Sequence, residues 1–575
     1  MIEIRNLNLP LSGGRAFGCA YDEARLRAAV ARRLGVPERS LDTCLVARRG
    51  IDARKRGDVH FVATVRASLA VPPERLEAEE RSLCARIGSG DVALVGKTPY
   101  VPPRYLRGEY AGSRPVVVGA GAAGLFAALA LAEAGVAPIV IERGAPAHER
   151  VRDVARFVAT GELDPESNIQ FGAGGAGTFS DGKLTTGTNV PENAWVLKTF
   201  VEAGASPDIL WQSHPHIGSD VLPGVVSNLV ARIERAGGEV RWRTRMTELV
   251  VEGGRLAGVR VESRLPAGAA DSADAPVEGT ATFSEVSYEI PCREAVLACG
   301  HSARDVLRML AERGFTLEPK TFSMGVRIEH PQRLVDEALY GREAGNPALG
   351  AASYKLSCHM PDGRGVYTFC MCPGGTVVAA ASEAGGVVTN GMSEFARDGA
   401  NANAALLANV YPADIPGIDA DPLAGVALQE RCERRAFELG GGSHVAPAQL
   451  LGDFMADARS SAGGSVAPTY PCGVAWGSVV EALPAYAVEA LRAGFPQLAR
   501  RLRGFDLRDA VLTGVETRTS CPVRVKRGST CESVDVEGLF PCGEGAGYAG
   551  GIVSAAADGL RCAEVMVERL NETRR

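Results

Sequence analysis

The sequence lacks a strong charge of either sign. Its 575 residues carry 62 Lys and Arg against 68 Asp and Glu, a formal net charge of -6. So small a charge on a chain of this length argues against a protein that binds nucleic acid in bulk. We also expect no secretory leader, because the first residues, MIEIRNLNLPLSGG, carry Glu3 and Arg5 and have no apolar run.

Cysteine patterns typical of metal sites and disulfide frameworks are also absent. None of the 14 cysteines forms C-x-x-C, and no Cys/His cluster has zinc-ligand spacing. We therefore expect no metal site and free thiols in a reducing compartment, which predicts a cytoplasmic protein. No Ser-His-Asp set and no paired carboxylates are legible, which disfavours a hydrolase.

One uncharged segment, residues 115–132, is about as long as a membrane span. Its internal order argues against that interpretation. A run of valines is followed by spaced glycines and then by an Ala/Leu-rich stretch, which is the order of a strand, a turn and a helix. We therefore expect no membrane span.

The same segment carries the most specific motif of the chain. PVVVGAGAAGLFAALALAEAGVAPIVIERG spans residues 115–144 and contains G-x-G-x-x-G between a strand and a helix. The first glycine permits a tight turn, the second lets a pyrophosphate approach the backbone, and the third lets the helix pack on the strand. The helix N-terminus attracts the phosphates, and the acid that ends the second strand accepts from ribose hydroxyls. The predicted contacts here are Gly119, Gly121, Ala122, Ala123, Gly124, Glu142 and Arg143.

Two further glycine-rich turns favour FAD over NAD. REAVLACGHSARD (293–305) resembles the strand that closes the FAD sheet, with Gly300 in its turn and Cys299 where Thr is common. GLFPCGEGAGYAGGIVSAAADG (538–559) resembles the Gly-Asp element that binds the ribityl chain in glutathione-reductase-type flavoproteins, with Glu544 in place of Asp. There the next helix points at the flavin pyrimidine. The contacts that this resemblance implies are Gly300, Gly543, Glu544, Gly550, Gly551 and Ile552.

The whole chain resembles the bacterial FAD-dependent dehydrogenases that join a small N-terminal α/β domain to a glutathione-reductase-like FAD domain. The motifs that carry the resemblance are IDARKRG, NIQFGAGGAGTFSDGKL, FCMCPGG, GVETRTSCPVR and GEGAGYAGGI. More distantly it resembles geranylgeranyl-reductase-like and fumarate-reductase-like flavoproteins. The resemblance implies the fold and FAD, and it implies no substrate.

A chain of this length predicts several domains. The order strand-helix-strand-strand-helix over residues 1–90 is typical of a ferredoxin-like α/β domain. The remaining predicted parts are a linker (91–113), the first part of a Rossmann-type FAD domain (114–320), an inserted mixed α+β substrate domain (321–510) and a return segment of the FAD domain (511–575). In the N-terminal hairpin a basic run is open to two interpretations: a contact with RNA or with an acidic partner, or a solvated turn. Without interleaved aromatics, the solvated turn is favoured for Arg48, Arg49, Arg54, Lys55 and Arg56.

The stretch QFGAGGAGTFSDGKL (170–184) nearly spells a phosphate-binding P-loop, G-x-x-x-x-G-K followed by Ser or Thr. Leu184 stands where the hydroxyl should be, and the preceding residues are polar rather than a buried strand. We therefore predict that the loop lies along the pyrophosphate and the flavin ring through Gly174, Gly175 and Gly177. Lys183 is expected near the flavin or the phosphates.

Three residues are candidates for chemistry: Lys183, Arg518 and Tyr548. Arginine in ETRTSCPVR can clamp a substrate carboxylate or pair with Glu516, and the sequence leaves both open. Tyr548 can shape the cavity or donate a proton. FCMCPGG puts Cys370 and Cys372 on one strand face. A redox disulfide there needs a distorted backbone, so buried structural thiols are favoured.

These features together predict an FAD-dependent oxidoreductase that moves hydride between flavin N5 and an organic substrate. No second strand–G-x-G-x-x-G–helix unit is present, so NAD(P)H or a protein electron donor is expected to bind transiently. Two alternatives remain open, an FAD-binding RNA-associated protein and a non-catalytic flavin-binding scaffold. The sequence leaves the oligomeric state open.

Overall fold

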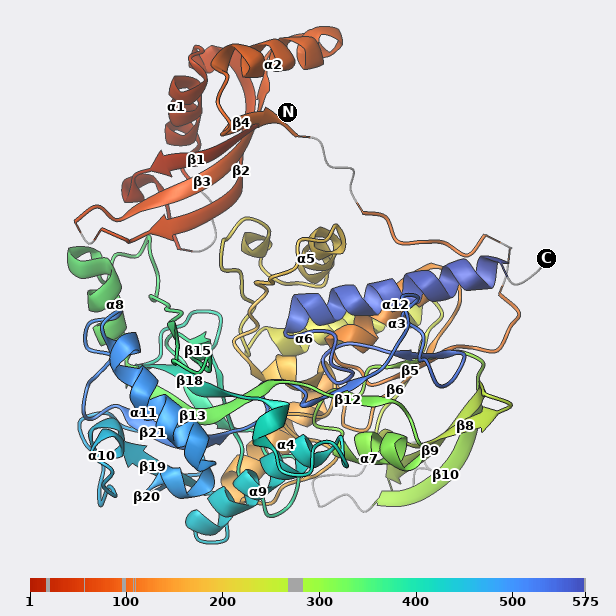
Figure 1. Cartoon of the computed structure of the whole chain (residues 1–575). Coiled ribbons are helices and arrows are strands. Elements are labelled where there is room, and N and C mark those ends of the chain that lie inside the picture. The colour runs from red at the N-terminus through yellow and green to blue at the C-terminus, as the bar shows by residue number, and fades with distance from the viewer. Residues whose placement is uncertain are drawn as a thin grey trace.

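The computed structural model describes residues 1–16, 21–55, 57–95, 100–106, 108, 110–266 and 283–572. Figure 1 shows an N-terminal domain at the top of the view, above a larger body that holds the other elements. The expected α/β class, with its FAD-binding Rossmann-type sheet, is confirmed.

The N-terminal domain has the predicted ferredoxin-like topology. Its antiparallel sheet has the order β2-β3-β1-β4. One helix connects the first two strands of the chain, and a second helix connects the last two. Asp22 caps the first helix by accepting from the Arg25 amide, and Gly35 ends it in the left-handed region at φ 64°. The last strand lies beyond the predicted boundary at residue 90. The elements are β1 (Ile2–Leu9), α1 (Glu23–Leu34), β2 (Leu41–Asp52), β3 (His60–Leu69), α2 (Pro73–Ile87) and β4 (Val92–Leu94).

The FAD domain is built on a parallel sheet of order β23-β11-β5-β6-β7. Its strands are β5 (Val116–Val118), β6 (Ile139–Ile141), β7 (Glu239–Arg241), β11 (Ala295–Leu297) and β23 (Leu539–Pro541), so the return segment completes the sheet. Apolar strands buried on both faces are typical of parallel sheets covered by helices. The helices are α3 (Ala122–Glu133), α4 (Ala147–Thr160), α5 (Glu192–Glu202), α6 (Leu222–Arg235), α7 (Arg304–Glu312) and α12 (Ile552–Glu572).

Helix α12 lies against α3, as Figure 1 shows. The approach is close because Gly559 of α12 has no side chain, and a Cβ there would lie 2.1 Å from the Ala123 carbonyl oxygen. A separate antiparallel meander follows the first half of the domain. It consists of β8 (Thr244–Glu252), β9 (Arg255–Pro266) and β10 (Phe283–Pro291). The irregular stretch between the last two strands falls largely outside the described residues.

The domain that was predicted to bind the substrate, called the substrate domain below, is built on a seven-stranded sheet of order β14-β15-β18-β13-β21-β19-β20. Its strands are β13 (Phe322–Pro331), β14 (Ser357–His359), β15 (Gly365–Cys372), β18 (Asn401–Val410), β19 (Ala446–Leu450), β20 (Val474–Trp476) and β21 (Val511–Glu516). The last of these lies past the predicted boundary at residue 510. The helices are α8 (Gln332–Tyr340), α9 (Ala424–Leu439), α10 (Leu451–Met455) and α11 (Ala485–Ala499). Two small ribbons complete it, β12 (Leu317–Pro319) with β22 (Val523–Val525) and β16 (Thr376–Ala379) with β17 (Thr389–Met392).

Arg49 fastens the N-terminal domain to the FAD domain. Its amide donates to the Trp211 carbonyl at 2.7 Å, and its guanidinium lies over the Phe61 and Trp211 rings. The side chain is therefore buried, which removes it from the basic run that was predicted to be a solvated turn. Arg54 of the same run pairs with Asp52, and Arg56 lies outside the described residues.

The described part of the linker docks on the FAD domain. The Tyr100 hydroxyl donates to Glu564 of α12, and its ring meets Trp195 edge-on. The Leu106 amide donates to Asn571 at 2.9 Å. The described part of the linker thus packs along α12. Among the residues that the structure describes, no helix is both long and apolar enough to cross a membrane.

Candidate functional site

The turn between β5 and α3 is shaped by three glycines with different tasks. At Gly119, φ is 100° and a Cβ would lie 2.5 Å from the Ala298 carbonyl oxygen. At Gly124 a Cβ would lie 1.9 Å from the Gly119 carbonyl oxygen. Gly121 differs, because its backbone is extended (φ -77°) and the nearest described atom to a Cβ would be Gly175 Cα at 3.8 Å. Two of the glycines hold the turn together, and the third faces open space.

The glycine-rich loop lies directly on this turn. The Gly174 amide donates to the Ala120 carbonyl at 2.8 Å, and Gly174 forms a β-bridge with Gly121. Leu184, at the end of the loop, is buried in the hydrophobic core. The glycine-rich loop therefore lies beside the β5–α3 turn. At the position where a P-loop binds its metal ion through a hydroxyl, this loop has the apolar side chain of Leu184.

The contact between loop and turn makes a first prediction. A valine at Gly175 would put its Cβ 3.0 Å from Gly121 Cα, and Gly175 has φ 62°, a conformation that valine rarely adopts. We expect Gly175→Val to weaken FAD binding at least about tenfold, since the overpacked loop must move. Leu184→Ser, which completes the P-loop sequence motif, should create no ATP binding. Calorimetric titration of the apoproteins with FAD and with Mg-ATP measures both, and unchanged FAD affinity in Gly175→Val would contradict this placement.

Glu142, at the end of β6, holds the same region together. Its carboxylate accepts from the amides of Ala120 at 2.8 Å and of Gly144 and Gly172 at 2.9 Å. One side chain thus links the turn to the glycine-rich loop. The predicted contact with ribose hydroxyls would be made by a carboxylate that is already fixed in place by three backbone donors.

Arg143 comes next in the chain and is held by two acids. Its guanidinium pairs with Glu166 at 2.8 Å and with Asp305 at 3.0 Å, and it lies 4.2 Å from the centre of the Phe171 ring. It also lines a cavity of about 270 Å³ together with Arg243, Arg245 and Arg264.

The β5–α3 turn and the glycine-rich loop on it form one end of a concave backbone surface, called the cradle below. Its second end is formed by Gly300 and by Gly550 and Gly551 near the start of α12. A Cβ at Gly300, Gly550 or Gly551 would have no described atom within 4 Å. Gly177 of the glycine-rich loop faces the same end, since a Cβ there would meet the Ile552 side chain at 3.2 Å. Open space at both ends, each beside a helix N-terminus, suits an extended anion such as a dinucleotide.

Glu544 lies at this second end with an altered acidity. Burial raises the pKa of Glu544 to about 7, although Lys320 and a hydrogen bond from the Gly551 backbone counteract it. His301 lies 4.0 Å away, and burial together with Arg518 and Arg304 lowers the pKa of its imidazole to about 4. A neutral histidine and a half-ionised carboxyl therefore face each other near pH 7.

Lys183 is held at the other end of the glycine-rich loop. Its Nζ lies 2.9 Å from Asp181, a fully buried carboxylate that also pairs with Arg397 at 2.5 Å. Burial lowers the pKa of Lys183, but the charges of Cys372, Asp181 and Cys370 outweigh it and raise the pKa. The lysine thus stays charged, with its neighbours on the substrate-domain strand β15 as well as on the loop.

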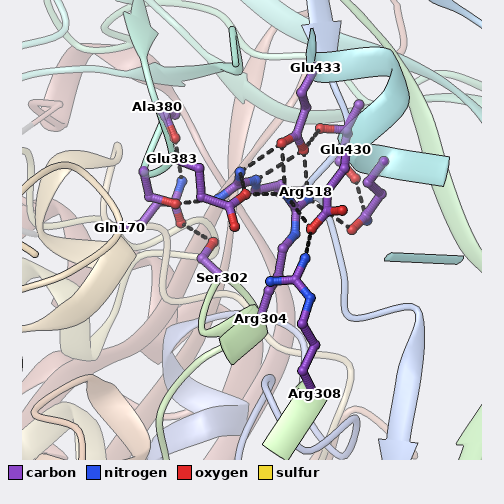
Figure 2. Close-up of polar contacts among 12 residues, drawn as sticks. Gln170, Ser302, Arg304, Arg308, Ala380, Glu383, Glu430, Glu433 and Arg518 are labelled. Atoms are coloured by element: carbon purple, nitrogen blue, oxygen red, sulfur yellow. Dashed lines mark hydrogen bonds and ion pairs between the residues drawn. The ribbon is translucent and has the colours of Figure 1, made fainter. Parts of the chain in front are cut away.

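Arg518 has partners other than the predicted Glu516. Its Nε and Nη2 donate to Glu433 at 3.0 and 2.7 Å, and its Nη1 donates to Ser382 at 2.5 Å. Figure 2 shows the guanidinium between Glu433 and Glu383, beside that of Arg304. These contacts favour the ion-pair interpretation over a substrate clamp and correct the partner, since Glu516 pairs instead with Arg327 at 2.9 Å.

The hydroxyl of Tyr548 is engaged by the backbone. It accepts from the Arg527 amide at 3.0 Å and donates to the Val525 carbonyl at 3.1 Å. The Arg527 guanidinium covers the ring at 3.7 Å from its centre, and Arg524 lies further off at 5.4 Å. These contacts suit the cavity-shaping role of Tyr548 better than proton donation.

Some charged residues of the site could not be recognised as a group in the sequence. Arg304 of α7 and Glu433 of α9 meet across the two domains at 2.7 Å. Arg327 and Glu516 meet on neighbouring strands of the substrate sheet. For Arg327 one signal existed, a charge in the middle of the apolar run FSMGVRIEHP. A charge in such a run indicates a buried ion pair, but it does not identify the partner.

Three potential metal ligands converge where no spacing indicated them. In the part of the chain that the structure describes, the one such group is Cys542, Asp558 and Cys562, whose ligand atoms lie within 4.8 Å of one another. The Asp558 carboxylate is already engaged by Arg527 at 2.6 and 3.0 Å and by the Gly543 amide at 2.8 Å. The guanidinium thus occupies the place of a cation at this group.

A family of FAD-dependent proteins matches the chain over the substrate domain, outside the cradle itself. Residues 321–519 match the family described as "FAD-dependent protein, C-terminal domain-like", and residues 1–68 match a "Domain of unknown function (DUF8436)". A protein of Clostridium beijerinckii, described as uncharacterised, is 41% identical over 571 residues, which cover 99% of both chains.

Among solved structures, the flavin-dependent brominase Bmp2 aligns over 80% of this chain and 80% of its own, with 10% identity and a TM-score of 0.34. Quinol fumarate reductase of E. coli aligns over 81% of this chain and 71% of its own, with 12% identity and a TM-score of 0.33. The assignment of the cofactor rests on the matched family and on the geometry of the cradle.

Proposed function

The chain belongs to a family of bacterial FAD-dependent proteins, and from this premise we propose that it is an oxidoreductase that moves a hydride between flavin N5 and a carbon of a small organic substrate. The cofactor is FAD, and the site is the space where the cradle meets the substrate domain. FAD supplies the hydride chemistry when bound, and the chain supplies binding, orientation and charge.

One observation carries this proposal: a single loop connects the cradle to the substrate domain. At Gly174 the glycine-rich loop is hydrogen-bonded to the β5–α3 turn, and near the end of the loop Asp181 forms an ion pair with Arg397 of the substrate domain. Its first residue, Gln170, donates to the Ala380 carbonyl at 3.2 Å. A molecule on the cradle would therefore lie beside the substrate domain, and this supports a substrate position from which a hydride can be exchanged.

The residues of the site would have separable tasks. The three glycines of the β5–α3 turn and the N-terminus of α3 bind the phosphates, and Glu142 fixes the turn. Glu544 accepts from a hydroxyl of the ribityl chain. Lys183 places a permanent positive charge beside the site, which favours negative charge on a reduced ring. The electron partner, NAD(P)H or another protein, would bind transiently.

Glu544 makes the affinity for FAD dependent on pH. A hydroxyl donor stabilises the carboxylate, so binding must displace the proton that the carboxyl holds below its pKa of about 7. The dissociation constant should therefore fall about tenfold between pH 6 and pH 8 in the wild type. In Glu544→Gln, which has no proton to lose, it should be nearly flat. Titration of apoprotein with FAD across this range measures it, and equal slopes in both proteins would contradict the role given to Glu544.

The reaction itself is tested by anaerobic reduction of the bound flavin. Purified holoprotein is mixed with NADH, NADPH and a panel of alcohols, amines, 2-hydroxy acids and unsaturated acids while the flavin absorbance is followed. The proposal expects at least one compound to bleach the flavin faster than an equal concentration of buffer salts. If dithionite bleaches the flavin but no organic donor does, and reduced flavin is reoxidised by no organic acceptor, the chain is a flavin-binding scaffold instead.

A further inference from the structure

Strand β15 is distorted at its two cysteines. Pairing with β18 is regular up to Phe369 opposite Ala405, and then shifts before Cys372 opposite Asn403. Cys370 lies in this bulge with φ 41°, a conformation that is uncommon for a residue with a side chain. In a regular strand the side chains of residues i and i+2 are about 6.6 Å apart. Here the bulge folds the Cys372 thiol back to 3.2 Å from the Cys370 carbonyl oxygen.

Cations surround the two thiols. The Arg327 guanidinium, which is fully buried, donates to the Cys370 carbonyl at 2.6 Å and to the Cys372 sulfur at 3.4 Å. A hydrogen bond from Cys372 lowers the pKa of Cys370 well below the ordinary thiol value, and Lys183 and Arg327 lower it further against the effect of burial. Burial and the same hydrogen bond raise the pKa of Cys372. The pKa of Cys370 is thus the lower of the two, which makes it the more nucleophilic thiol of the pair.

The two sulfurs differ in access. Cys372 is fully buried, whereas Cys370 is half-buried and follows Phe369, whose side chain is exposed. The charge of Cys370 contributes to the raised pKa of Glu544, the carboxyl at the second end of the cradle, although burial is the main cause. An accessible thiolate, a buried partner thiol and a neighbouring cofactor site are the parts that a dithiol redox centre needs.

We propose that Cys370 and Cys372 form a redox-active pair that exchanges two electrons with the flavin, an inference that rests on the proposed function. In the oxidising direction an S–S bond forms between the two sulfurs. The Cys372 proton and two electrons leave the pair, and oxidised flavin takes up both electrons with one proton. The reverse reaction breaks the S–S bond and restores the thiolate of Cys370 and the thiol of Cys372.

The first test maps the disulfide and does not depend on enzyme activity. Holoprotein is treated with diamide, its remaining thiols are blocked, and its peptides are weighed. The peptide that spans residues 365–397 should lose about 2 Da relative to its dithiothreitol-treated form, because two thiol hydrogens leave. The loss should vanish in Cys370→Ser and in Cys372→Ser. The loss of mass should persist in the matched control Cys358→Ser, which replaces a buried cysteine on the neighbouring strand β14. It should also persist in Cys562→Ser, which replaces a cysteine of the group formed with Cys542 and Asp558.

The second test counts electrons. Diamide-treated holoprotein, freed of reagent, is titrated anaerobically with dithionite. The wild type should take up about two electrons more per chain than Cys372→Ser, which should need only the two that reduce the flavin. Equal uptake in both proteins, with no loss of mass in the peptide, would overturn the redox pair. A failure of the proposed function gives a different result. If the disulfide is mapped but no organic donor reduces the flavin, the proposed substrate reaction is wrong and the redox pair stands.

Discussion

Gly121→Val is expected to lose FAD and keep its fold. The extended backbone at this position accepts a β-branched residue, and the nearest described atom to the new Cβ would be Gly175 Cα at 3.8 Å. The valine would therefore fit the protein and would fill the space that the pyrophosphate needs. We expect the affinity for FAD to fall at least about a hundredfold, since an overpacked site must be forced open for binding.

The measurement compares flavin content after purification and FAD titration of the apoprotein, with far-ultraviolet circular dichroism as the check on folding. Gly187→Val is the matched control, because no described atom lies within 4 Å of the Cβ it adds and it is exposed on a loop outside the cradle. Gly124→Val is the opposite control. It should damage the fold as well, since its Cβ would collide with the Gly119 carbonyl. Full FAD content in folded Gly121→Val would show that the cradle is elsewhere.

Glu433→Gln is expected to destabilise the contact between the two large domains. The Glu433 carboxylate is buried between Arg304 and Arg518, 2.7 Å from each, and also accepts from the Thr517 hydroxyl at 2.7 Å. Figure 2 shows the three charged side chains converging from both domains. Without the Glu433 charge, Arg304 keeps Glu383 and Glu430 as acidic partners, and Arg518 keeps Glu383. Such a loss typically costs about 3–5 kcal/mol.

The same network predicts how stability depends on pH. Burial raises the pKa of Glu433, but Arg518 and Arg304 overcome this effect and hold the pKa well below its ordinary value of 4.5. A carboxyl whose pKa is lower in the folded state stabilises the fold above its unfolded pKa, and the stabilisation is lost as the pH falls below it. We therefore expect the wild type to lose more stability than Glu433→Gln between pH 5 and pH 3.

Urea unfolding of the apoproteins, followed by tryptophan fluorescence and by limited proteolysis of the domain boundary, measures both effects. The exposed pair Arg333–Glu337 provides the control, because its partners lie four residues apart on the surface of α8. Glu337→Gln should leave the midpoint unchanged. A midpoint in Glu433→Gln equal to that of Glu337→Gln would show that the buried network contributes no stability.

The cofactor cradle was predictable from the sequence because its constraints act on the backbone. Gly119 and Gly124 are required by a positive φ and by a collision with a carbonyl, and such constraints are met within a few residues of the chain. Val116–Val118 and Ile139–Ile141 are apolar runs between glycines, so a parallel sheet followed from local pattern alone. The FAD-domain return could be found because it repeats this pattern.

The polar part of the site could not be predicted, because its contacts join distant segments. Arg518 and Arg304 both pair with Glu433, so three separate parts of the chain meet at one carboxylate. The acid that is near Arg518 in sequence, Glu516, pairs with Arg327 instead. Charge alone does not choose among such partners; topology does. The bulge at Cys370 was missed for a related reason. A strand pattern predicts alternation, and the register shift depends on pairing with β18.

Every role proposed for the site depends on FAD bound across the turn of β5 and α3. The most direct test is to purify the protein, denature it, and identify and count the released flavin by chromatography and mass. The account predicts FAD, close to one per chain after saturation, from a yellow protein with a flavin spectrum. Release of FMN alone, or a colourless folded protein that takes up no added FAD, would contradict it.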